Sequence, residues 1–244
     1  MNLTAGDWLL MLAGSVLVGV SKTGITGLSL LFVSMFAAVM PAKSSTGLVV
    51  PLLILGDFIA VGSYRAHTQW RHILHLFPWA AAGIVGGYFA LGRMDDRQAR
   101  TSIGVIILGL AGLHIYRRLR PAGEGGRHGA WFGPVIGILA GFTTIVANAS
   151  GPLVIIYLLA MGLAKMEYMG TAAVFFLLLN LFKTPFMVSL GLINRQSLGL
   201  DLALLPAMLA GAWLGKWILL RMNQQVFEKV ALALTLLAGA RLFF

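Results

Sequence analysis

The sequence predicts an all-α polytopic membrane protein, and three observations carry that prediction. Of its 244 residues, 59% are hydrophobic and 11% charged, with a mean hydropathy of +0.88, whereas about a quarter of a soluble domain is charged. Apolar runs of roughly 18 to 25 residues, the length that crosses a hydrocarbon core, recur along the chain. Two stretches of the chain are also near copies of each other.

Eight apolar segments divide the chain into two halves of four. The first half is 1–116, the second is 131–244, and a charged linker containing Gly and Pro, 117–130, lies between them. The chain starts without the basic residues of a cleavable signal peptide, so we expect the first apolar segment to stay in the mature protein. The predicted segments are 8–40, 44–64, 73–91, 101–116, 131–161, 168–190, 198–219 and 226–243.

The third and seventh segments carry the near copies. Internally duplicated membrane proteins are candidate secondary transporters, because such folds place the substrate site where the two halves meet. The repeated glycines are also of the kind that lets membrane helices pack closely, as are Gly133, Gly137 and Gly141. At identical spacing, the first copy has Pro78, Gly83, Gly87, Arg93, Met94 and Asp95, and the second has Pro206, Gly211, Gly215, Arg221, Met222 and Asn223.

The first and fifth segments are too long for one crossing. A straight helix over 8–40 would be about 50 Å long at ~1.5 Å per residue, against a hydrocarbon core of ~30 Å, yet two full crossings would each be too short. Residues that break or cap helices interrupt both runs midway, near Lys22 in the first and near Asn148 in the fifth. Each run therefore predicts two half-helices, joined by a break that is buried in protein or faces a water-filled cavity. We expect the two breaks to lie close together.

The direction of the two halves depends on these broken segments. If each is a re-entrant hairpin, every half crosses the membrane an odd number of times and the repeats are inverted. If each crosses once, the repeats are parallel. The distribution of Lys and Arg favours inverted repeats with a cytoplasmic linker.

Three ionisable residues lie well inside the predicted segments: Lys22, Asp57 and Lys183. A charge at the bilayer centre costs at least ~2.5–3.5 kcal/mol, so each residue needs a partner or a function. Asp57 and Asn180 occupy matching positions in the two halves. Together the three charges leave a net positive charge that suits a bound anion. Alternatively, Asp57 could pair with Lys183 or with Lys22, or Lys183 could extend toward the membrane surface.

Composition and missing motifs exclude several classes of function. The net charge of +10 comes from short Arg clusters between apolar runs, which set topology and contact lipid headgroups, so no nucleic-acid partner is expected. The chain has no Cys, which excludes disulfides and thiol chemistry. No phosphate-binding loop and no hydrolase or zinc-protease motif occurs. We therefore expect that the protein is not an enzyme and that it has no cofactor and no metal site.

The pattern resembles the sulfite exporter TauE/SafE family over essentially the whole chain. The resemblance rests on Gly19 before the first break with Gly24 and Gly27, on Gly141 before 147–152, and on the repeated Pro and Gly motif. It implies a multi-pass permease of the bacterial inner membrane for sulfite, sulfonates such as sulfoacetate, and related anions. The sequence departs from the usual denser glycine runs in both breaks, and a Lys in the first break supports an anionic substrate.

The sequence hypothesis is a secondary transporter that exports a small inorganic or organic sulfur anion by alternating access, coupled to protons. A passive anion channel and a non-transporting assembly or receptor subunit remain alternatives. Expected partners are the anion, protons and membrane lipids, with a homodimer left open. Asp57 is the candidate for proton coupling, because a buried carboxylate beside a departing anion can take up a proton, and Asn180 and Lys183 belong to the same group. The predicted substrate-binding residues are Ser21, Lys22, Thr23, Gly24, Thr26, Gly27, Thr143, Thr144, Asn148, Ser150 and Gly151.

Overall fold

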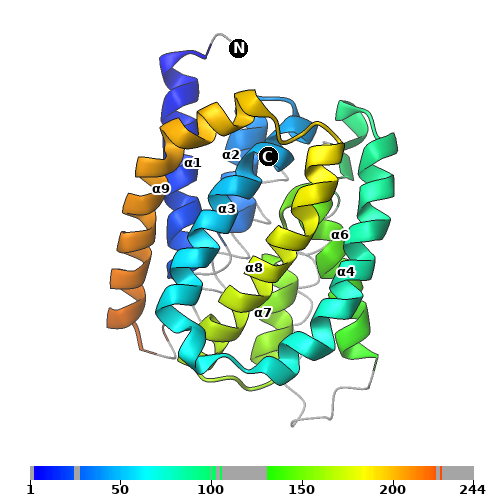
Figure 1. Ribbon diagram of the computed structural model, residues 1–244. Coiled ribbons are helices and arrows are strands. Elements are labelled where there is room, and N and C mark those ends of the chain that lie inside the picture. The colour runs from blue at the N-terminus through cyan, green and yellow to red at the C-terminus, as the bar shows by residue number, and fades with distance from the viewer. Residues whose placement is uncertain are drawn as a thin grey trace.

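The computed structural model describes residues 3–24, 28–99, 101–102, 105, 131–223 and 226. Over those residues the protein is built from helices without strands, which confirms the all-α prediction (Figure 1). The linker 117–130 and nearly all of the fourth and eighth predicted segments lie outside the described residues.

The first segment is broken where the sequence predicts a break. Helix α1 (Ala5–Thr23) starts at Thr4, whose hydroxyl accepts a hydrogen bond from the Asp7 N–H, while the Asp7 carboxylate accepts one from the Thr4 N–H. The helix ends at Gly24, just after Lys22, and α2 (Ser29–Val39) follows.

The fifth segment is broken in the same way. Helix α6 (Phe132–Ala147) ends at Asn148, whose φ of 49° is left-handed, a backbone conformation that Asn tolerates better than most residues. Helix α7 (Gly151–Ala160) then begins with Ser150 as its N-cap and Pro152 in its first turn. Both predicted breaks are thus confirmed.

The remaining described helices match single predicted segments. They are α3 (Ala42–Tyr64), extended by the short 3₁₀ helix η1 (Arg65–His67), α4 (Trp70–Arg93), α8 (Lys165–Ser189) and α9 (Arg195–Arg221). Each begins two or three residues before the predicted segment, because polar residues at the membrane boundary continue the helix beyond the apolar run. Together with α1, these helices are long and apolar enough to cross a membrane.

The helices form two packed pairs on either side of α3 and α8 (Figure 1). Helix α1 packs along α9 on one side, and α4 packs along α6 on the other. Helix α1 begins at the end of the molecule where α3 begins, and α2 leads back toward that end, whereas α6 begins and α7 ends at the opposite end. Each broken segment therefore folds back as a hairpin whose two ends lie at the same end of the molecule.

Glycines bring both pairs into backbone contact. A methyl group on Gly211 of α9 would collide with the carbonyl of Val16 in α1, and one on Gly83 of α4 would collide with the carbonyl of Ile138 in α6. Gly19 and Gly141 meet the partner helices in the same way. Close packing at the repeated glycines, as the sequence predicted, is confirmed.

A lysine at the start of each central helix, α3 and α8, binds the end of a neighbouring helix. Lys43, at the start of α3, donates to the Met94 carbonyl at the end of α4 (2.9 Å). Lys165, at the start of α8, donates to the Met222 carbonyl at the end of α9 (2.6 Å). Cations at the C-terminal carbonyls of a helix are electrostatically favourable.

Candidate functional site

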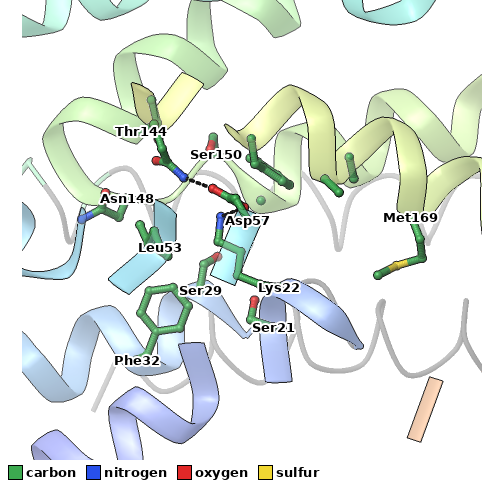
Figure 2. Close-up of a pocket in the computed structure, with 15 residues that line it drawn as sticks. Ser21, Lys22, Ser29, Phe32, Leu53, Asp57, Thr144, Asn148, Ser150 and Met169 are labelled. Atoms are coloured by element: carbon green, nitrogen blue, oxygen red, sulfur yellow. Dashed lines mark hydrogen bonds and ion pairs between the residues drawn. The ribbon is translucent and has the colours of Figure 1, made fainter. Parts of the chain in front are cut away.

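A small cavity lies where the two breaks meet (Figure 2). It has a volume of about 40 Å³, room for on the order of three waters. Its apolar lining includes Phe32, Leu53 and Phe176. Its polar lining consists of Ser21, Lys22, Ser29, Asp57, Thr144, Asn148, Ser150 and Asn180. The break tips are therefore close in space, as predicted.

Lys22 carries the positive charge at the cavity wall. Its ammonium group lies 2.7 Å from Asp57, whose side chain is fully buried, and Figure 2 shows the two side chains pointing toward each other. The Lys22 ammonium also lies 4.8 Å from the centre of the Phe176 ring, within cation–π range. Gly56 leaves room for the Lys22 stem, since a Cβ there would lie 2.9 Å from Lys22 Cγ.

Asp57 also connects the two halves of the molecule. One carboxylate oxygen pairs with Lys22 of α1, and the other accepts a hydrogen bond from the Asn180 side-chain amide of α8. The predicted alternative, a pair between Asp57 and Lys183, is wrong, because the nearer cation comes from the first break.

Lys183 is buried behind the second break. Its side chain is fully buried, so the alternative that it extends toward the membrane surface is also wrong. The ammonium donates to the Asn148 side-chain oxygen (2.6 Å) and lies 3.3 Å from the Thr144 hydroxyl. Among the described residues its hydrogen-bond acceptors are neutral oxygens, whereas the carboxylate of Asp57 pairs with Lys22.

Asn148 holds the second break in place. Its left-handed backbone ends α6, and its side-chain amide donates to the Thr46 carbonyl of α3 (2.9 Å). The same side chain accepts from Lys183. A single residue therefore links the end of α6 to both central helices.

Two helix N-termini face the cavity. Ser29 is the first residue of α2 and Gly151 the first of α7, and both line it. A Cβ on Gly151 would lie 3.0 Å from the Ser29 hydroxyl oxygen, so the two helix starts are neighbours. Helix N-termini offer free N–H groups and the positive end of the helix dipole, which together favour a bound anion.

The remaining predicted residues lie outside the cavity lining. The Thr23 hydroxyl donates to the Ala212 carbonyl of α9 (2.6 Å), and Gly24 packs against Gly215, so both serve the contact between α1 and α9. Thr143 bonds back to its own helix. Thr26 and Gly27 lie outside the described residues.

Two polar residues were missed by the sequence hypothesis. Ser29 lines the cavity with a buried hydroxyl that has no hydrogen-bond partner among the described residues; its position just after the first break could have indicated it. Asp201 is buried in α9, near the start of the seventh predicted segment, and the sequence hypothesis did not single it out.

These features define a class of protein. Helices that can cross a membrane surround a buried, charged site, and two broken segments contribute the ends of short helices to that site. This architecture is typical of secondary transporters, whose broken helices bind substrate near the midplane.

The chain belongs to the sulfite exporter TauE/SafE family, which it matches over residues 11–242. This confirms the resemblance predicted from the sequence. No curated protein and no solved structure matches the chain.

Proposed function

We propose that this protein is a proton-coupled secondary transporter that exports a small sulfur oxyanion, such as sulfite, across the bacterial inner membrane. The observation that carries the proposal is the cavity itself, where Lys22 and the N-termini of α2 and α7 converge. The family points to the same substrate class.

The size of the cavity supports the smallest anions of that class. A volume of about 40 Å³ suits sulfite better than sulfoacetate, which has roughly twice as many heavy atoms. In the proposed complex, Lys22 neutralises the anion, and the hydroxyls of Ser21, Ser29, Thr144 and Ser150 donate hydrogen bonds to its oxygens. Asp57 competes with the anion for Lys22, so protonation of Asp57 would free the ammonium for the substrate.

We also infer that the two halves are inverted repeats. Three contacts support this inference, because each has a counterpart with the halves exchanged. Gly211 meets α1 as Gly83 meets α6, Gly19 meets α9 as Gly141 meets α4, and Lys43 caps α4 as Lys165 caps α9. Alternating access would then move one half against the other around the shared cavity.

Substrate-dependent stabilisation of the purified protein tests the binding site. At about ten times Kd, a ligand that binds only the folded state adds roughly 1.4 kcal/mol, or ~3–5 °C in melting temperature. We expect sulfite to give this rise, with smaller effects from sulfate, thiosulfate and longer sulfonates. Equal responses to all the anions, or none to sulfite, would contradict the proposed site.

A further inference from the structure

Asp201 is a second buried carboxyl group, on a helix that is not part of the cavity lining. Its side chain is 4% exposed, and neither carboxylate oxygen has a hydrogen-bond partner among the described residues. An unpaired carboxylate in an apolar helix contact is so costly that such a group takes up a proton instead. An ionisable group inside a membrane segment is by default a functional one.

The neighbouring helices leave Asp201 without a cation. Helix α9 packs against α1 and α3. The charged groups on these three helices are either exposed or engaged elsewhere. Asp7 caps α1, Lys22 pairs with Asp57, Lys43 caps α4, the Tyr64 hydroxyl donates to Thr23, and Arg195, Lys216 and Arg221 are exposed.

A second cavity lies against the same stretch of α9, although Asp201 itself is not among the residues that line it. It has a volume of about 240 Å³ and lies between the start of α3 and the turn from α8 to α9. Ser197 and Leu200 of α9 line it. Asp201 follows Leu200 directly and lies one helical turn after Ser197, on the same buried face. The cavity has room for on the order of twenty waters, which can accept or deliver a proton.

Helix α1 connects Asp201 to the substrate site. The buried face of α9 that carries Asp201 continues through Met208 and Gly211, which pack on α1, and the end of α1 carries Lys22. If the carboxyl O–H bond breaks and the proton passes to water, a bare carboxylate remains in the contact between α9 and its neighbours. Relief of that cost requires the contact to open, and opening it displaces α1.

We infer that Asp201 is a proton-binding residue that exchanges its proton with the water of the second cavity and couples that exchange to anion transport. The coupling part rests on the proposed function. Proton binding itself does not.

Infrared spectroscopy of the purified full-length protein at neutral pH tests proton binding without any substrate. A protonated carboxyl group has a carbonyl-stretch band separate from that of a carboxylate. We expect this band in the wild type and in the control Asp57→Asn, and its loss in Asp201→Asn. An unchanged band in Asp201→Asn overturns the inference.

Proteoliposomes test the coupling. Sulfite counterflow needs no net proton movement, so Asp201→Asn should retain it, while uptake driven by a pH gradient should fall about tenfold or more. The coupling is overturned if Asp201→Asn shows pH-driven uptake at the wild-type rate, or if it loses counterflow. If the wild type shows no counterflow with any sulfur anion, the proposed function fails, and the infrared band alone then decides whether Asp201 binds a proton.

Discussion

Lys22 has two roles at the residue scale, because it pairs with Asp57 and faces the cavity. Removal of one partner of a buried ion pair typically costs about 3–5 kcal/mol, since the other charge is left uncompensated. We expect Lys22→Ala to destabilise the protein by an amount in this range. Adding Asp57→Asn should restore stability close to wild type, because the carboxylate that lost its partner is then removed as well. Melting temperatures of the two single variants and the double variant give the interaction free energy between Lys22 and Asp57.

The ligand response of the same variants separates pairing from substrate binding. The stable double variant should show no sulfite-dependent rise in melting temperature, because the cationic group of the site is gone. Lys22→Arg should keep the pair but bind less well, since a planar guanidinium replaces a compact ammonium. A normal sulfite response in the double variant would remove Lys22 from the site.

Sequence reasoning found the charged residues but left open which of them pair. Lys22, Asp57 and Lys183 stand out because charge is rare in apolar segments, whereas the pairing of Lys22 with Asp57 depends on how α1 rotates against α3. The rotation of α1 also decides the role of Thr23. The sequence hypothesis assigned Thr23 to the substrate, but its hydroxyl faces α9 instead. Ser29 was missed because a serine within an apolar run does not reveal which side it faces.

At the scale of helices, the glycine contacts explain why α4 can lie so close to α6. Gly83→Ala should destabilise the protein by on the order of 1–3 kcal/mol, because the new methyl group collides with the Ile138 carbonyl and the backbones must separate. Gly86→Ala, in the same helix, is the matched control. Its Cβ would meet nothing within 4 Å, so it should be neutral or stabilise by up to ~1 kcal/mol. Thermal unfolding in detergent compares the two, and equal effects would contradict the packing account.

The helical elements were largely predictable, because hydropathy and length are local properties. The breaks near Lys22 and Asn148 followed from segments too long for one crossing, with helix-breaking residues midway. The left-handed conformation of Asn148 and its bonds to Thr46 and Lys183 were not predictable, because they depend on helices distant in sequence.

At the scale of the whole molecule, the hairpins predict which residues share a membrane face. Introduced cysteines at positions 43 and 165 should react with a membrane-impermeant reagent from opposite faces, because one hairpin ends near each position. Position 123, in the linker, should react from the same face as 165. Reaction of 165 from the face opposite to 123 would show a single crossing and parallel repeats.

Sulfite transport in proteoliposomes containing the purified wild-type protein tests the central claim most directly. With a pH gradient imposed, sulfite should accumulate above its equilibrium distribution, and the stable Lys22→Ala/Asp57→Asn variant should show no accumulation. Sulfite that only equilibrates across the membrane would indicate a passive channel, and no protein-dependent sulfite movement would contradict the transporter account altogether.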